Sequence, residues 1–336
     1  MFQRILIPLD GSQRAEQALP TAATIARFFQ ATVILLRVCP SDTELLWTIS
    51  NAPRVFSDVL EQEIQQADTY LSRIRAAGEQ EGIHTVALRR QGNPARLILE
   101  VAVAYRCDLI VMCSHGATGL KRWVLGSVAH HVSRHSTTSV LIVREGTEAP
   151  TIHHAEGVRQ ISIQIALDGS PLAETIIPAA IDLSAALSDP LPGKIRLIQV
   201  VEQDLFAGRQ QTENENEQHL RRHFLSQAHQ YLQAVQRRIA MEMPATVPCD
   251  LETEVVVGQD IASTLLEQAS LHEEEDEEDI ILALVTRSRG LSRWAVGSVA
   301  DRLLTWAHRP LFIRCPSSFS LSEPSTLGEM AVPTKD

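Results

Sequence analysis

The stretch RILIPLDGS (residues 4–12) reads as a buried β-strand that runs directly into a turn. Its apolar residues form a continuous run, which is typical of a parallel strand covered by helices on both faces. The stretch returns as ISIQIALDGS (161–170), and GLKRWVLGSVA (119–129) returns as GLSRWAVGSVA (290–300) with eight of eleven residues identical. Two repeated pairs in the same order predict that the chain is a tandem duplication.

Each half alternates apolar runs with segments whose apolar residues recur at spacings of three and four. The runs predict five strands in each half, at 4–9, 32–38, 85–91, 108–114 and 139–145 and at 161–167, 194–201, 251–257, 279–285 and 310–315. The periodic segments, including 14–29, 59–82 and 94–106, predict helices. This pattern predicts an α/β fold of two tandem doubly wound domains, each a five-stranded parallel sheet flanked by helices.

The chain length fits this division, because 336 residues is about twice the roughly 150 residues of a usual single domain. The predicted organisation is a first domain at 1–145, a polar linker at 146–160, a second domain at 161–316 and a disordered tail at 317–336. Two further stretches, 210–218 and the acidic run 273–279, are expected to be mobile. We interpret the acidic run as a solvated loop that enters a strand, with partner binding as the alternative.

Charge and composition exclude several classes of partner. A formal net charge of -11 opposes contact with nucleic acid or anionic lipid, because such surfaces require clustered Lys and Arg. No apolar run approaches the roughly 20 residues of a membrane span, and the amino terminus enters a strand rather than a signal peptide. Five cysteines without C-x-x-C spacing predict reduced thiols. We therefore expect a soluble, cytoplasmic protein with no nucleic-acid or membrane partner.

Three segments of the first half are expected to converge at one edge of its sheet. In open parallel sheets, ligands bind beyond the carboxyl ends of the strands. The segments are PLDGS (8–12), RVCP (37–40) and MCSHGATGLKRWVLGS (112–127), which follow the first, second and fourth strands. This edge is the predicted ligand site.

The third segment has the composition of a phosphate-binding loop. Gly116 is followed after nine residues by Gly126 and Ser127, which open a predicted helix. Glycine lets a ligand approach the backbone, and a helix start offers free N–H groups and the positive end of a dipole. The combination suits a di- or triphosphate, with the Ser127 hydroxyl donating to phosphate or to a metal-bound water. The simpler alternative is that Ser127 is an N-cap and Gly126 only makes the turn.

Asp10 ends the first strand, and its role stays open between two interpretations. It can cap the following helix, with Gln13 reaching back, or it can accept hydrogen bonds from a ribose hydroxyl or a base amine. No P-loop or dinucleotide fingerprint occurs in the chain.

Both halves resemble the universal stress protein (UspA) family in a tandem, two-domain form. The ATP-binding branch of that family carries G-x-x-G-x(9)-G-[ST] after the fourth strand, an Asp after the first strand and a backbone contact to adenine after the second. The resemblance implies an adenine-nucleotide site in the first half, for ATP, ADP or AMP with Mg²⁺ arriving on the nucleotide. It assigns to that site Pro8, Asp10, Val38, Met112, Cys113, Gly116, Gly126, Ser127 and Val128.

The resemblance also implies a regulatory or stress-protective function in which ATP hydrolysis is slow or absent. Spacing alone reveals no Ser-His-Asp or paired-carboxylate constellation, and no catalytic residue or protein-built metal site is predicted. The family commonly pairs domains through the last strand, so 139–145 and 310–315 are expected to pair as an internal pseudo-dimer, which itself can form a homodimer.

The chain departs from the family pattern in both halves. Cys113 replaces the first signature glycine, so its side chain is expected to weaken the site where a ligand approaches the backbone. In the second half, Leu284 and Arg287 stand at the positions of Cys113 and Gly116, while Gly297 and Ser298 are retained. The second nucleotide loop is therefore predicted to be degenerate.

Some features of the second half leave its binding role open. Asp168 and Val200 are retained, and Arg287 and Arg289 leave open a phosphate site that works by charge. The alternative function for the whole chain is a nucleotide-free UspA-like scaffold that acts through protein partners, which Cys113 and the degenerate loop favour. A third alternative, an ATP-dependent enzyme of the same broad fold, is the least favoured, because the chain contains no S-G-G-x-D-S loop.

Overall fold

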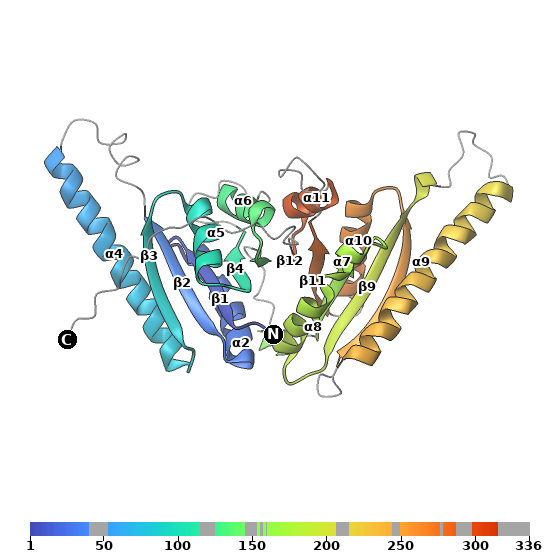
Figure 1. Ribbon diagram of the computed structural model, residues 1–336, viewed down its shortest axis with the longest axis horizontal. Coiled ribbons are helices and arrows are strands. Elements are labelled where there is room, and N and C mark those ends of the chain that lie inside the picture. Colours follow the sequence, from blue (N-terminus) through green and yellow to red (C-terminus); the bar gives the residue numbers. More distant parts are fainter. Residues whose placement is uncertain are drawn as a thin grey trace, which may run out of the picture.

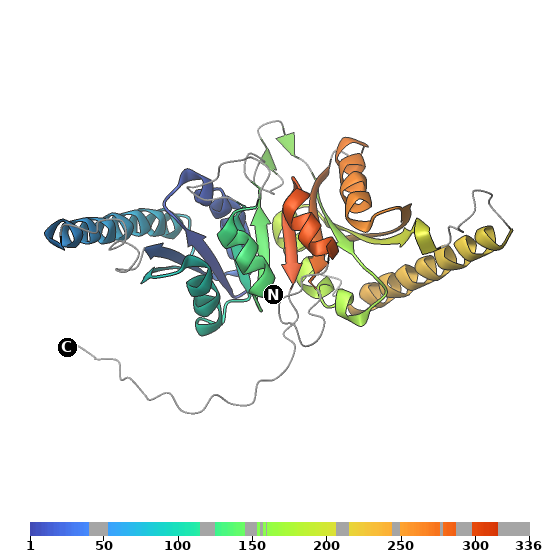
Figure 2. The same cartoon turned by 90° about the horizontal axis from the view of Figure 1, so that it is seen from above.

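The structure is a computed structural model in which one large sheet carries helices on both faces (Figures 1 and 2). It describes residues 1–39, 53–114, 125–144, 153–154, 157–158, 160–205, 215–243, 249–275, 278–286 and 298–314. Among these residues, no helix is both long and apolar enough to cross a membrane. The predicted tail at 317–336 lies outside the described part of the chain.

The two halves contain the same five-stranded parallel arrangement. The first half has β1 (Arg4–Leu9), β2 (Thr32–Cys39), β3 (Thr85–Gln91), β4 (Leu109–Cys113) and β5 (Ser139–Val143), in the order β3-β2-β1-β4-β5. The second half has β8 (Gln160–Ala166), β9 (Gly193–Glu202), β10 (Cys249–Gly258), β11 (Glu278–Val285) and β12 (Leu311–Arg314), in the order β10-β9-β8-β11-β12. The predicted α/β fold with two parallel sheets is confirmed.

The two five-stranded sheets join into one sheet of ten strands. β5 and β12 pair antiparallel, with Leu141 opposite Phe312, and both side chains are fully buried. Figure 2 shows these two strands side by side at the centre of the molecule. The last strands of the two halves therefore pair as expected, and neither of them is left as a free edge.

The helices divide between the two faces of the sheet. The first half has α1 (Gln13–Glu16), α2 (Ala18–Phe29), α4 (Pro53–Gln80), α5 (Pro94–Ala104) and α6 (Ser127–His135), and the second has α7 (Pro171–Glu174), α8 (Ile177–Ser188), the 3₁₀ turn η1 (Gln203–Leu205), α9 (Glu215–Glu242), α10 (Ile261–Glu275) and α11 (Ser298–Trp306). One core layer lies beneath α2, α4, α8 and α9, and the other beneath α5, α6, α10 and α11. Each layer runs through both halves.

The helix predicted at 14–29 is interrupted at Gln17, which lies between the end of α1 at Glu16 and the start of α2 at Ala18. Pro20 explains the break, because proline lacks an N–H and is tolerated only in the first turn of a helix. The second half repeats it, with Pro178 in the first turn of α8.

A small antiparallel hairpin occupies part of the segment expected to be a linker. It consists of β6 (His153–His154) and β7 (Gly157–Val158). Of the stretch 210–218 that was expected to be mobile, residues from Glu215 onward belong to α9, and 210–214 lie outside the described residues.

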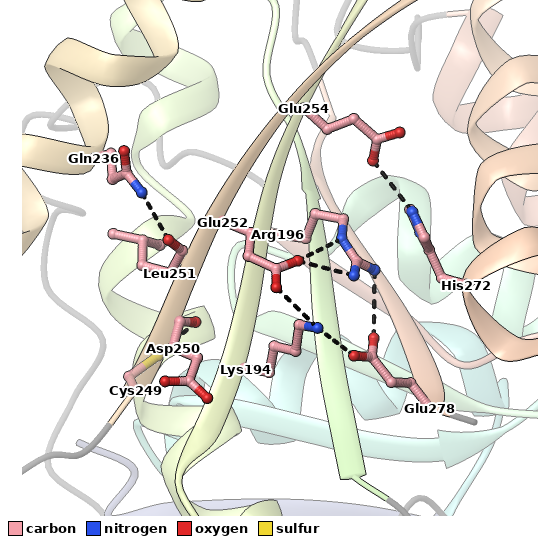
Figure 3. A network of polar contacts seen from close by, with 10 residues as sticks. All are labelled: Lys194, Arg196, Gln236, Cys249, Asp250, Leu251, Glu252, Glu254, His272 and Glu278. Atoms are coloured by element: carbon pink, nitrogen blue, oxygen red, sulfur yellow. Dashed lines mark hydrogen bonds and ion pairs between the residues drawn. The ribbon is translucent and has the colours of Figure 1, made fainter. Parts of the chain in front are cut away.

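The interpretation of the acidic run 273–279 as a solvated loop is wrong for most of the run. Residues 273–275 belong to α10, and Glu278 begins β11 with a side chain that is 3% exposed. Its carboxylate pairs with Lys194 and with Arg196, whose Nη1 lies 3.3 Å from Oε2 (Figure 3). Glu278 is buried because two cations of β9 meet its carboxylate.

The ionic layer around Glu278 extends to the edge strand β10. Glu252 contacts the same two cations, at 3.0 Å from Lys194 Nζ and 2.9 Å from Arg196 Nη2, and Glu254 lies 3.4 Å from His272 (Figure 3).

The first half carries apolar residues at three of the positions that match this ionic layer. Aligned through the repeated first strand and the strand registers, Ile34, Val86 and Leu88 correspond to Arg196, Glu252 and Glu254, whereas Thr32 corresponds to Lys194. One half therefore has apolar side chains at three positions where the other half has charged ones.

Candidate functional site

The carboxyl ends of β1, β2 and β4 lie on one edge of the sheet, because these strands are parallel neighbours. This edge brings together five of the residues assigned from the sequence: Pro8, Asp10, Val38, Met112 and Cys113. Gly126, Ser127 and Val128 are at the start of α6, and Gly116 lies outside the described residues.

Asp10 does not cap α1, so the capping interpretation is wrong. The N-cap is Ser12, whose hydroxyl oxygen accepts a hydrogen bond from Ala15 N at 3.2 Å. Asp10 Oδ1 accepts from Ser12 N at 2.9 Å and from the Ser12 hydroxyl at 2.6 Å. The carboxylate therefore holds the capping serine in place while it faces the carboxyl edge of the sheet.

Arg37, a residue that no sequence motif signals, lies against this turn. Gly11 has φ +82°, and a Cβ atom placed on it would stand 3.2 to 3.3 Å from the guanidinium atoms of Arg37. Register places Arg37 opposite Leu9, one residue before Asp10. The edge of the first half therefore carries a cation at the Asp10–Gly11 turn.

The glycine-rich loop is closed at its base by a hydrogen bond. Gly126 N donates to Ser114 O at 2.8 Å, and Ser114 N donates to Val143 O at 2.8 Å. These bonds set the start of α6 beside the end of β4.

Gly126, rather than Ser127, is the N-cap of α6, so the N-cap interpretation of Ser127 is wrong. Ser127 is the first helical residue and is exposed. Gly126 has φ -58° and ψ 147°, a conformation open to any residue, and it offers no side-chain acceptor to the first N–H groups of the helix. The helix therefore starts with donors that a ligand can meet.

Cys113 is 6% exposed, and its sulfur lies 3.8 Å from Gln17 Oε1. From the sequence, this side chain is expected to stand where a ligand approaches the backbone. The structure places the thiol against the junction of α1 and α2.

The second half repeats the hydrogen bonds of the Asp10 turn, but it differs from the first half in the residues that follow its fourth strand. Asp168 Oδ1 accepts from Ser170 N at 2.9 Å and from the Ser170 hydroxyl, and Ser170 caps α7. The strand registers match Cys113 with Val285 rather than with Leu284, so the predicted alignment at this position is wrong by one residue. Leu284 is buried in β11, and Ser298 begins α11. Arg287, Arg289 and Gly297 lie outside the described residues.

A pocket of about 440 Å³ opens at the carboxyl ends of β8 and β9. It is lined by the Asp168–Gly169 turn and by residues of β9, α9 and α10. In the described part of the chain, no group of three or more His, Cys, Asp or Glu side chains is placed to hold a metal ion.

Comparisons with known proteins place these features in a family. The family model described as "Universal stress protein family" matches residues 1–144. The chain is 34% identical over 148 residues to the universal stress protein YxiE of Bacillus subtilis, which covers 43% of this chain and 100% of that protein. It is 35% identical over 147 residues to a universal stress protein of Methanocaldococcus jannaschii, covering 43% of this chain and 84% of that protein.

A solved structure extends the likeness of fold to both halves. The crystal structure of a universal stress protein from Archaeoglobus fulgidus superposes with a TM-score of 0.62 at 17% identity. The match covers 94% of this chain and 98% of that one.

Proposed function

Because the chain belongs to the universal stress protein family, we propose that its first half binds an adenine nucleotide, ATP or its relatives ADP and AMP, and that binding serves a regulatory or stress-protective function. The observation that carries this proposal is the closed loop base, where the Gly126–Ser114 hydrogen bond sets the uncapped start of α6 at the end of β4, on the same edge of the sheet as the Asp10 turn. Donors for phosphate and an acceptor for the sugar or base thus share one edge.

The residues of this edge divide between the parts of the nucleotide. Asp10 accepts hydrogen bonds from ribose or from the base amine, while Pro8, Val38 and Met112 form the walls and backbone contacts for adenine. The first N–H groups of α6, at Ser127 and Val128, meet the phosphates, to which Mg²⁺ is bound when it arrives with the nucleotide.

Arg37 strengthens this proposal. Its guanidinium lies at the Asp10–Gly11 turn, and a guanidinium on this edge of the sheet favours an anionic ligand. We propose no turnover beyond slow hydrolysis, since the roles given to these residues are binding and positioning.

The proposal is tested by thermal unfolding of the full chain with and without Mg-ATP. At a nucleotide concentration a hundred times the dissociation constant, binding adds about 2.7 kcal/mol to the folded state and raises the unfolding midpoint. Gly126→Val is expected to remove this shift, because a side chain at the helix start obstructs the phosphates. Valine introduces no backbone strain at φ -58°.

The matched control is Gly297→Val in the second copy of the loop, which is expected to keep the shift. If the folded wild-type chain shows no shift with any adenine nucleotide, the proposal fails. The second candidate, a nucleotide-free scaffold that acts through protein partners, would then stand, and the specific feature in its favour is Cys113 in place of the signature glycine.

A further inference from the structure

One edge of the ten-stranded sheet is the strand β10, Cys249–Gly258, which in the described part of the chain pairs with β9 on one side and with no strand on the other. All ten of its residues are at least partly exposed. An edge strand offers main-chain N–H and C=O groups that can pair with a strand from another chain. What β10 can bind therefore depends on which of these groups point outward.

The hydrogen bonds of β9 determine which residues of β10 point outward. Leu167 N, just beyond β8, donates to Ile198 O at 2.9 Å, so the even-numbered residues of β9 face β8 and the odd-numbered ones face β10. Ile195 of β9 lies opposite Leu251. In parallel pairing, the residues on either side of Leu251 then bond to Ile195, while Leu251 points its own N–H and C=O away from the sheet. The odd-numbered residues of β10 therefore form the open edge.

A side chain of α9 covers the beginning of this edge. Gln236 Nε2 donates to Leu251 O at 2.7 Å, which agrees with the outward direction of Leu251. Thr253, Val255 and Val257 follow along the same edge, and within the described residues no hydrogen bond closes their outward groups. A further strand can thus add to β10 from Thr253 onward.

The opposite edge of the sheet, β3, carries a protection that β10 lacks. Arg89 and Arg90 lie on β3, and Arg90 Nη1 donates to Arg89 O at 2.9 Å. Cationic side chains on an edge strand hinder the addition of another strand. The ten residues of β10, CDLETEVVVG, include no Lys, Arg or Pro. The two edges of the molecule therefore differ in how readily they accept a partner.

A groove of about 470 Å³ opens along β10. It is lined by Glu252, Thr253 and Glu254 of β10, by Gln236 of α9 and by His272 of α10. Figure 3 shows Gln236 and His272 on opposite sides of the strand. The groove therefore follows the strand between two helices, where a strand that adds to the sheet would lie.

The side chains of β10 are acidic on the side that faces α10. Asp250, Glu252 and Glu254 alternate with the outward-pointing residues, and Glu254 Oε2 lies 3.4 Å from His272 Nε2. Glu254 Oε2 and His272 Nδ1 are buried, and neither makes a hydrogen bond within the described part of the chain. Glu252 is already paired with two cations of β9, so Asp250 and Glu254 supply most of the attraction for a cationic group.

The α9 side of the same edge is apolar. Val255 and Val257 belong to one apolar cluster with Phe224 and Leu225 of α9. A strand that adds to β10 places its successive side chains on alternate faces of the sheet. One set of these side chains then lies beside valines and the other beside carboxylates. The edge therefore matches a segment in which apolar and basic residues alternate.

We propose that β10 docks an extended segment of a partner protein in which Lys or Arg alternates with apolar residues. The segment pairs through its main chain with the open edge at 253–257. Its basic side chains lie beside Asp250 and Glu254, and its apolar ones lie beside Val255 and Val257. This surface shares no residue with the proposed nucleotide site, so either proposal can fail without the other.

The test uses the full chain and a fluorescently labelled peptide of alternating lysine and valine with both ends blocked. Fluorescence anisotropy measures its affinity, and a glutamate–valine peptide of the same length is the matched probe of opposite charge. The lysine–valine peptide is expected to bind at least about tenfold more tightly, because like charges across an interface are unfavourable. It is also expected to slow hydrogen exchange in 251–258 and to leave exchange in 85–91 of β3 unchanged.

Thr253→Pro removes one outward N–H group, which an edge strand tolerates because that group takes no part in the ladder to β9. The variant is expected to bind the lysine–valine peptide about tenfold more weakly or worse. Ala87→Pro is the matched control, since Ala87 occupies the corresponding position of β3, and it should leave the affinity unchanged. Circular dichroism verifies that both variants fold.

Glu254→Gln tests the charge preference while the main chain stays intact, and it is expected to weaken the lysine–valine peptide about twofold to fivefold. Glu100→Gln on α5 is its control, because it removes one negative charge far from the strand edge in sequence and fold. The proposal is overturned if the lysine–valine peptide does not bind, if both peptides bind equally, if exchange slows elsewhere than at β10, or if Thr253→Pro keeps full affinity. Should Thr253→Pro not fold, equal losses in Glu254→Gln and Glu100→Gln would also overturn it.

Discussion

Arg144, the residue that follows β5, donates a hydrogen bond from Nη2 to the carbonyl oxygen of Leu304 in α11, at 2.9 Å. The same guanidinium also donates to the carbonyl oxygens of Leu303 at 3.4 Å and Arg309 at 3.3 Å. The side chain is 6% exposed, and burial lowers the pKa of Arg144 to about 10. The end of the first half thus supplies the donor for the last turn of a helix in the second half.

Arg144→Met is expected to lower the free energy of unfolding by about 1 to 3 kcal/mol, because three carbonyl oxygens lose a donor while the apolar stem is kept. Denaturant unfolding measures the change. Arg134→Ala is the control: it also faces the second half, at 3.5 Å from Asp301, but on the solvent side, so it should cost less than about 0.5 kcal/mol. Equal effects of the two variants would refute the donor role of Arg144.

The ionic layer predicts a large difference between two glutamates that contact the same cations. Glu278 is 3% exposed and Glu252 is 46% exposed. Glu278→Ala removes the buried carboxylate that contacts Lys194 and Arg196, and it is expected to destabilise the fold by about 3 to 5 kcal/mol. Glu252→Ala removes a partner that water can replace, and about 1 kcal/mol or less is expected. The comparison is made by urea unfolding, and similar losses would show that burial does not decide the contribution.

A pH dependence is expected at the start of α10. Ser263 N donates to Asp260 Oδ2 at 2.8 Å, and this bond, followed by Arg302, lowers the pKa of Asp260. A carboxyl group whose pKa is lowered by folding stabilises the folded state above its unfolded pKa of about 3.9, and the contribution is lost as the pH falls through the folded value. Asp260→Asn should flatten the acid side of the stability profile.

Unfolding midpoints between about pH 2 and pH 7 check this expectation. Asparagine is already the equivalent cap in the first half, where Asn93 Oδ1 accepts from Arg96 N at 3.0 Å. The variant should therefore keep the helix start intact at neutral pH. If the unfolding midpoint falls as steeply with decreasing pH in Asp260→Asn as in the wild type, Asp260 is not the source of the acid dependence.

Substitutions in the two repeated turns distinguish helix capping from nucleotide binding. Ser12→Ala and Ser170→Ala each remove an N-cap and are expected to cost about 1 kcal/mol of stability. Only Ser12→Ala should also weaken Mg-ATP, because Ser12 holds the Asp10 carboxylate. Titration of both variants with nucleotide decides the point, and a loss of affinity in Ser170→Ala alone would move the nucleotide site to the second half.

The strands could be predicted to within two residues at their ends, because continuous apolar runs record burial on both faces of a sheet. The break at Gln17 was missed even though Pro20 signals it, since apolar periodicity continues across the break. Local spacing predicts where an element lies better than where it stops.

The errors at the site have a different origin. Asp10 and Ser12 are both good caps, and the choice between them depends on the turn at Gly11 rather than on residue type. Arg37 and Glu278 depend on strand register, because their partners come from other strands of the sheet. No local pattern shows which charged side chains a fold will bring together.

The pairing of Leu141 with Phe312 restricts how each half could assemble alone. Antiparallel pairing of two equivalent strands is the contact of a twofold-symmetric dimer, in which a central residue faces its own copy. Two first halves would set leucine against leucine and leave unfilled volume, while two second halves would crowd phenylalanine against phenylalanine. The fused chain pairs the smaller Leu141 with the larger Phe312 where both side chains are fully buried. Each half therefore packs better against the other half than against a second copy of itself.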